Sequence, residues 1–142
     1  MTYRVDYTTK NQQKQIKPQN GGFLVEEAIY VDGGLVDYLV PPHGRAVAKT
    51  VIPPNNRVDC YLPTTNNTNN EAELFAILFG VVRAVKENIK IVYTDSQWAL
   101  GAVTTYKVKN PRLKLLSNCI KALLKFYEIE IKWISREENL AT

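Results

Sequence analysis

The chain has 142 residues, of which 45% are hydrophobic and 23% are charged, and its formal net charge is +4 at pH 7. This length suits one domain with a proper core, and the positive charge favours an anionic partner such as nucleic acid, although many proteins with this surplus bind none. The two cysteines lie far apart, which argues against a disulfide framework or a zinc site. The sequence shows no signal peptide and no membrane span, so we expect a soluble, cytoplasmic protein.

The first part of the chain has strand patterns separated by turn signals. Residues 8–22 are polar and predict a loop or mobile arm, and residues 2–8 could still form a short strand. Strand-like runs follow at residues 23–31, 35–40, 45–52 and 57–63, with Asp32-Gly33-Gly34 predicted as a turn between the first two. This order predicts a β-meander.

The second part predicts helices alternating with strands. After the polar run TTNNTNN, apolar residues recur at helical spacing on nearly every side, which is typical of a buried, central helix. Residues 90–95 form a β-branched strand, Ser96 can cap a short helix, and Asn110-Pro111 can start a helix that reaches about Tyr127. The last strand alternates, with Ile129, Ile131 and Trp133 expected to face the core. Together these elements predict an α/β sandwich with a mixed sheet.

Three acidic residues stand out in this outline. Asp32 and Asp95 close predicted strands, and Glu73 lies in the first turns of the buried helix. Each has a structural explanation when taken alone, as a turn residue, as part of a helix cap, or as a complement to a helix N-terminus. If they converge, however, they form a site of oxygen ligands without His or Cys, which suits two Mg²⁺ or Mn²⁺ ions. Two such ions can activate a water and stabilise the leaving oxygen, so the chemistry implied is metal-assisted phosphodiester hydrolysis.

The motifs around these acids resemble type 1 ribonuclease H. TNNEAEL contains Glu73, YTDSQ contains Asp95, and TTYKVKNPRLKLL and WISREEN are similar to the compact archaeal and bacterial members. The resemblance covers about residues 28–142 and leaves residues 1–27 as an N-terminal extension, partly loop or extra strand. It implies a ribonuclease H-like fold with a mixed five-stranded sheet, whose first three strands are antiparallel, flanked by helices.

The resemblance also implies the activity and the site. A member of this family hydrolyses the RNA strand of RNA–DNA hybrids endonucleolytically by a two-metal-ion mechanism, and this chain would do so as a monomer. Asp32, Glu73 and Asp95 match the first three catalytic metal ligands. Short polar side chains can read 2′-hydroxyls in the wide minor groove of an A-like hybrid. The residues expected to contact the substrate are Thr68 (near a DNA phosphate), Asn69, Asn70, Gln97, Tyr106, Lys107, Arg136 and Asn139. Lys109 could extend the phosphate-binding surface with Lys107, and the alternative for both lysines is a solvated surface charge.

The sequence departs from the family pattern in two places. The family's fourth ligand is an Asp after the last strand, and here Thr142 stands at or next to that position. Glu137 or Glu138 could partly substitute for it, but both are expected to be solvent-exposed. The glycine-rich loop after the first Asp is nearly absent, and Asp6 is an alternative first ligand in a second alignment. The chain has no basic protrusion between Asp95 and Asn110, so hybrid affinity should be modest and salt-dependent.

These departures leave alternatives open. The loss of one carboxylate ligand should weaken the second metal ion and lower the rate. The chain could therefore be a weakened or inactive hybrid-binding module, an inactivated variant or a truncated chain. It could also be the ribonuclease H domain of a viral or mobile-element protein.

Overall fold

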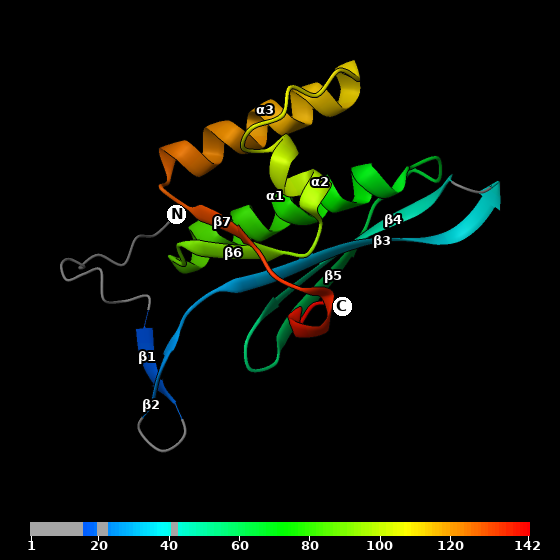
Figure 1. Cartoon of the computed structure of the whole chain (residues 1–142). Helices are drawn as coiled ribbons and strands as arrows, with labels where there is room; N and C mark the ends of the chain where they lie inside the picture. The colour runs from blue at the N-terminus through cyan, green and yellow to red at the C-terminus, as the bar shows by residue number, and fades with distance from the viewer. Residues whose placement is uncertain (1–15, 20–22, 41–42) are drawn as a thin grey trace.

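The computed structural model describes residues 16–19, 23–40 and 43–142, which form a two-stranded sheet, a five-stranded sheet and three α-helices (Figure 1). None of the helices in these residues is long and apolar enough to cross a membrane. The elements are β1 (Ile16–Gln19), β2 (Phe23–Glu26), β3 (Ile29–Val40), β4 (His43–Ile52), β5 (Asn56–Tyr61), α1 (Asn69–Glu87), β6 (Ile91–Thr94), α2 (Gln97–Ala102), α3 (Pro111–Phe126) and β7 (Glu130–Trp133), followed by a 3₁₀ turn at Arg136–Glu138.

The large sheet is mixed. Its strand order is β5-β4-β3-β6-β7, in which β3, β4 and β5 are antiparallel neighbours and β6 and β7 run parallel to β3. This is the predicted ribonuclease H-like architecture, and the fold class is confirmed. The division of the chain at residue 28 stays a prediction.

The strand boundaries in the first part of the chain correct the sequence prediction. Asp32-Gly33-Gly34 is not a turn but the middle of β3, where these three residues pair with Lys49, Ala48 and Val47. The glycine is needed for packing, because a Cβ on Gly33 would lie 2.3 Å from the carbonyl oxygen of Ala72 in α1. The two runs at 23–31 and 35–40 are therefore β2 and one long β3.

Two further expectations concern the N-terminal part. Residues 16–19, predicted within a loop, form strand β1 and pair with β2. The expected strand at residues 2–8 and the rest of the polar run outside 16–19 lie beyond the described residues.

Helix α1 covers one face of the sheet, as the apolar pattern predicts. It begins with a capping box, in which the Thr68 side chain accepts from the backbone N–H of Glu71 and the Glu71 side chain accepts from that of Thr68. Its buried residues join a core cluster with β3, β6 and α3. The largest fully buried apolar side chains there are Ile29, Val31, Leu74, Ile77, Val81, Ile89, Val92 and Ile120.

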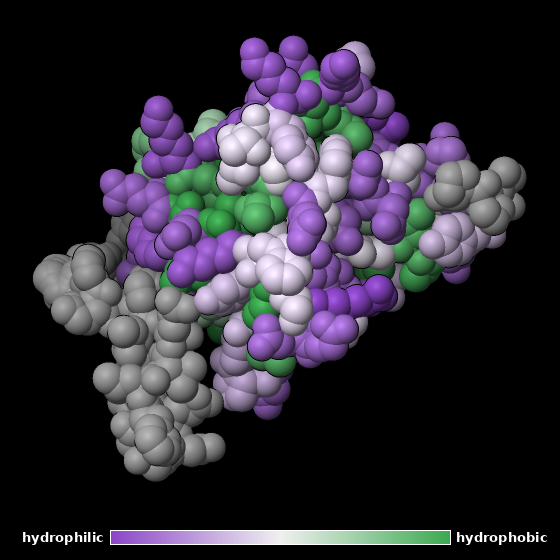
Figure 2. All heavy atoms as spheres, in the orientation of Figure 1, coloured by the Kyte–Doolittle hydropathy of each residue, from purple (hydrophilic) through white to green (hydrophobic). Residues whose placement is uncertain are grey.

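Helix α3 lies over α1 as an outer layer (Figure 1). Asn110 caps it, accepting from the backbone N–H groups of Arg112 and Leu113. Its inner face is buried through Leu113, Ile120 and Leu124, and exposed apolar side chains lie among hydrophilic ones over this layer in Figure 2. The amphipathic pattern predicted this packing.

The C-terminal segment lies across the sheet face opposite α1 (Figure 1). On this face the rings of Tyr30 and Tyr93 stack at 5.1 Å, and Ala141 is fully buried. Trp133 was expected to face the core, and this expectation is wrong. The residue is 46% exposed, and its indole N–H donates to the carbonyl oxygen of Asp95 at 3.2 Å.

Candidate active site

Three carboxylates meet where β6 ends and its pairing with β3 stops. Val31 on β3 is paired with Thr94 on the parallel strand β6, so the next residues along both strands, Asp32 and Asp95, lie side by side. Glu73 comes from the second turn of α1. One ligand oxygen from each of the three residues lies within 4.8 Å of the others, which makes this the one cluster of three or more potential metal ligands among the described residues.

Glu73 is fixed by the close approach of its helix to β3. Its Oε1 accepts from the backbone N–H of Gly33 at 3.1 Å. The same glycine leaves room for Ala72, one residue before Glu73, to contact the strand. The absence of a side chain at position 33 therefore brings the helix carboxylate to the strand carboxylate.

The cluster concentrates negative charge in a partly desolvated place. Burial, followed by the charge of Asp95, raises the pKa of Asp32 from 3.8 to about 6. Burial, followed by the charge of Asp32, raises the pKa of Glu73 from 4.5 to about 8. Lys49 and Arg136 act in the opposite direction on the pKa of Asp32 without cancelling the rise.

This arrangement fits a divalent cation. An ion bound between the carboxylates would relieve both their repulsion and the cost of their burial. The donor atoms are carboxylate oxygens only, which is the set that Mg²⁺ and Mn²⁺ accept.

The carboxylates line an open cleft of about 490 Å³. Asn69, at the start of α1, and Arg136 are the substrate contacts predicted from the sequence that this cleft contains. Tyr38 and Lys49 also line it and were missed. Its full lining is Asp32, Gly33, Gly34, Leu35, Tyr38, Lys49, Asn69, Glu73, Asp95, Ser96, Arg136 and Thr142.

Asn139 has a different role from the one expected. It is 5% exposed, and its side-chain amide donates to Asp95 Oδ2 and to the carbonyl oxygen of Val31, both at 3.0 Å. Its Oδ1 accepts from the backbone N–H of Ala141 at 3.0 Å. Because these groups are bonded within the protein, Asn139 orients Asp95 and is not placed to contact a substrate.

Thr142, predicted to lie at or next to the position of the family's fourth acid, lines this cleft. Its backbone N–H donates to the carbonyl oxygen of Asn139 at 3.3 Å, and its hydroxyl donates to that of Arg136 at 3.4 Å. Glu137 and Glu138 are exposed, and Glu138 accepts from the Ser135 hydroxyl. Neither joins the cluster. Asp6, the alternative first ligand, lies outside the described residues.

A second cleft of about 470 Å³ lies beside the α1 N-terminus, where Asn70 lines it. It contains three predicted contacts, Asn70, Tyr106 and Lys107. The Tyr106 ring is held against Gly101, where any Cβ would lie 2.3 Å from the ring. Thr68 and Gln97 line neither cleft. The remaining lining residues are Trp98, Val108, Lys109, Asn110 and Leu113.

Comparison with known proteins agrees with this geometry. Residues 44–142 match the sequence family described as reverse transcriptase-like. The chain belongs to this family, which is also ribonuclease H-like. The matched residues include Glu73 and Asp95 and exclude Asp32, whose place in the cluster comes from the geometry. No curated protein sequence matches the chain significantly.

Solved structures extend the likeness to the whole fold. The N-terminal RNase H domain of a Mycobacterium tuberculosis protein is 25% identical with a TM-score of 0.65, covering 80% of this chain and 84% of that one. RNase H1 of Halobacterium salinarum is 20% identical with a TM-score of 0.64, covering 82% and 90%. LC11-RNase H1 from compost, solved in complex with an RNA/DNA hybrid, is 24% identical with a TM-score of 0.64, covering 81% and 89%. The resemblance to type 1 ribonuclease H is confirmed.

Proposed function

We propose that this family member hydrolyses the RNA strand of RNA–DNA hybrids endonucleolytically, with two Mg²⁺ or Mn²⁺ ions held by Asp32, Glu73 and Asp95. The observation that carries the proposal is the meeting of these three carboxylates, one ligand oxygen from each lying within 4.8 Å of the others. In this family such a site lies where the scissile phosphate binds. The raised pKa values of Asp32 and Glu73 support it, because they mark acids that a cation would stabilise.

The residues of the cleft have separate tasks in this proposal. Bound ions would supply an activated water and stabilise the leaving oxygen. Arg136 and Lys49 add positive charge in the same cleft, where a phosphate would enter. Asn139 holds the Asp95 carboxylate in one orientation by donating to its Oδ2. The chain thus presents fixed carboxylates and long cationic side chains to the substrate.

The two clefts suit the two strands of a hybrid. Asn69 lines the carboxylate cleft and Asn70, its neighbour at the start of α1, lines the other. We assign the RNA strand to the carboxylate cleft and the DNA strand to the second, where Tyr106 and Lys107 would contact sugar and phosphate. The asparagines between them would then lie in the minor groove, where 2′-hydroxyls distinguish RNA from DNA. Thr68 and Gln97, which line neither cleft, remain proposed contacts with the substrate.

The test is cleavage of labelled substrates by the wild-type chain and by Asp95→Asn. We expect Mg²⁺- or Mn²⁺-dependent cleavage of RNA in a hybrid and none of duplex DNA, and a loss of at least about 1000-fold in Asp95→Asn. Glu87→Gln, which removes an exposed carboxylate at the end of α1, is the control and should cleave normally. Undiminished cleavage by Asp95→Asn would disprove the assigned site.

A second candidate function is hybrid binding without turnover. Thr142 favours it, because this residue without a carboxylate lines the cleft at or next to the predicted position of the fourth ligand. This candidate predicts that the wild-type chain binds the hybrid but leaves it intact even in Mn²⁺. The same cleavage assay, combined with a binding measurement on the same hybrid, separates the two candidates.

A further inference from the structure

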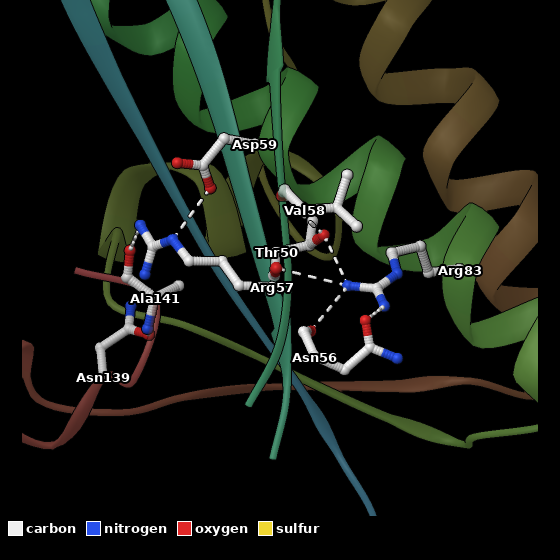
Figure 3. Close-up of polar contacts among 8 residues, drawn as sticks. All are labelled: Thr50, Asn56, Arg57, Val58, Asp59, Arg83, Asn139 and Ala141. Atoms are coloured by element: carbon white, nitrogen blue, oxygen red, sulfur yellow. Dashed lines mark hydrogen bonds and ion pairs between the residues drawn. The ribbon is translucent and has the colours of Figure 1, made fainter. Parts of the chain in front are cut away.

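Two arginines hold the edge strand β5 from opposite faces of the sheet (Figure 3). On the helix face, Arg83 of α1 donates to the Thr50 hydroxyl at 3.0 Å and to Asn56 Oδ1 at 2.9 Å. On the other face, Arg57 of β5 donates through Nε to Asp59 Oδ1 at 3.1 Å and through Nη2 to the carbonyl oxygen of Ala141 at 3.3 Å. Arg57 therefore ties β5 to a segment 84 residues later in the sequence.

The segment that Arg57 holds is the one that orients Asp95. Ala141 is fully buried, so its carbonyl oxygen has little access to water as an alternative partner. The backbone N–H of Ala141 donates to Asn139 Oδ1, and the Asn139 amide donates to Asp95 Oδ2. A continuous series of hydrogen bonds thus runs from Arg57 through Ala141 and Asn139 to a carboxylate of the site.

The strand register places Arg57 correctly for this contact. Arg57 pairs with Val51, and Asp59 pairs with Lys49, whose other neighbour is Asp32. The side chains of Arg57 and Asp59 therefore lie on the same sheet face as Asp32 and the C-terminal segment. Asp59 holds the guanidinium by its Nε, which leaves Nη2 directed at Ala141 (Figure 3).

We propose that Arg57, held by Asp59, is a positioning residue for the metal site. Its hydrogen bond to the Ala141 carbonyl fixes residues 139–142, so that Asn139 keeps Asp95 oriented and residue 142 stays in the cleft. Arg57 itself is not among the residues that line the carboxylate cleft. The inference rests on the proposed function in one respect, that Asp95 binds the metal ion.

The first measurement is Mn²⁺ binding to the full chain without substrate, followed by the electron paramagnetic resonance signal of free Mn²⁺. We expect Arg57→Ala to raise the Mn²⁺ dissociation constant about tenfold, the lower end of the effect seen for outer-shell partners of metal ligands. Arg57→Lys can still donate to the Ala141 carbonyl and should recover part of the loss. Arg83→Ala is the matched control, since it weakens the other face of β5 and should leave the dissociation constant unchanged.

A double-mutant cycle shows whether Arg57 acts through Asn139. If it does, Arg57→Ala adds little to the loss already caused by Asn139→Ala, because the two changes break the same series of hydrogen bonds. A second readout needs no metal ion: in Arg57→Ala the side-chain amide protons of Asn139 should exchange faster in NMR spectra than in the wild type. Additive losses in the cycle, or an Asn139 amide unaffected by Arg57→Ala, would overturn the proposal.

Asp95→Asn in the same binding assay separates this inference from the proposed function. If Asp95→Asn binds Mn²⁺ as tightly as the wild type, the proposed metal site is wrong. If Asp95→Asn weakens binding while Arg57→Ala does not, the site stands and the role of Arg57 is refuted.

Discussion

The two faces of the central sheet are held in different ways. On the α1 face, contact is made by close-packed apolar side chains such as Ile29, Val31 and Leu74, all fully buried. On the opposite face, a short C-terminal segment buries only the small Ala141 side chain as an apolar group and is also attached through hydrogen bonds of Asn139 and Arg57. The site lies between the two, taking Glu73 from the helix face and the orientation of Asp95 from the other.

This difference separates stability from site geometry. Apolar packing over a whole helix contributes most of the free energy of folding, and it tolerates little change in volume. A few hydrogen bonds contribute much less to folding, but they fix the direction of a carboxylate. Substitutions on the helix face should therefore unfold the protein, and substitutions on the opposite face should leave it folded with an altered site.

The two adjacent glycines of β3 give the largest expected contrast. Gly33→Ala places a Cβ 2.3 Å from the Ala72 carbonyl, so α1 must move away from β3. We expect this overpacking to lower the free energy of unfolding by about 3 kcal/mol. Gly34→Ala meets only a methyl group of Val47 at 3.7 Å and should change it by less than about 1 kcal/mol.

Urea denaturation of both variants measures this contrast. The two substitutions add the same methyl group to neighbouring residues of one strand, so strand propensity cannot explain a difference between them. Equal losses of stability would mean that the close contact of α1 with Gly33 does not limit the fold.

The pH dependence of stability comes mainly from the helix side of the site, because the pKa of Glu73 is raised further than that of Asp32. The pKa of Glu73 is raised to about 8 in the folded chain, so the fold binds its proton more tightly than the unfolded chain does. This stabilisation is complete below the ordinary Glu pKa and is lost as pH rises through about 8. Without metal ions, the melting temperature should fall by about 5 °C between pH 5 and pH 8.5 and fall much less in Glu73→Gln.

Calorimetry in a chelator, repeated with Mg²⁺, tests this prediction. The side-chain amide oxygen that Glu73→Gln introduces can still accept from the Gly33 N–H, so the variant removes the charge and keeps the contact. Glu87→Gln, which replaces an exposed carboxylate, should follow the wild-type curve. A wild-type melting temperature that does not change over this range would contradict the pKa of Glu73.

The sequence predicts the helix face better than the opposite face. Apolar periodicity locates α1 and α3, and the TNNEAEL and YTDSQ motifs locate Glu73 and Asp95. These signals are local, because each lies within one element. The glycines of β3 were misinterpreted as a turn because Gly-Gly has two physical uses, and only the approach of α1 distinguishes them.

The opposite face depends on contacts between distant residues. Lys49 enters the cleft through its pairing with Asp32, and the β3–β4 register shifts between Val36 and Val40, so counting back from the hairpin does not give this pair. The burial of Asn139 depends on Val31, 108 residues away. A single sequence contains no signal for either contact.

The smallest expected effect is on Mn²⁺ affinity, when a carboxylate is added at residue 142. Thr142 lines the carboxylate cleft, so Thr142→Asp would add a fourth oxygen ligand from the C-terminal segment. We expect the Mn²⁺ dissociation constant to fall about tenfold, since affinity for such ions rises with the number of charged ligands. Thr142→Asn has nearly the same shape without the charge and should bind Mn²⁺ as the wild type does.

The same substitution should lower the stability of the metal-free chain, because a fourth carboxylate adds repulsion to a cluster that already raises the pKa of Asp32 and Glu73. Tighter Mn²⁺ binding together with weaker metal-free stability identifies a ligand pointing into the cluster. If Thr142→Asp and Thr142→Asn bind Mn²⁺ equally, residue 142 is directed away from the carboxylates. The C-terminal segment would then act on the site through Asn139 alone, and Arg57→Ala should have its full effect whichever residue occupies position 142.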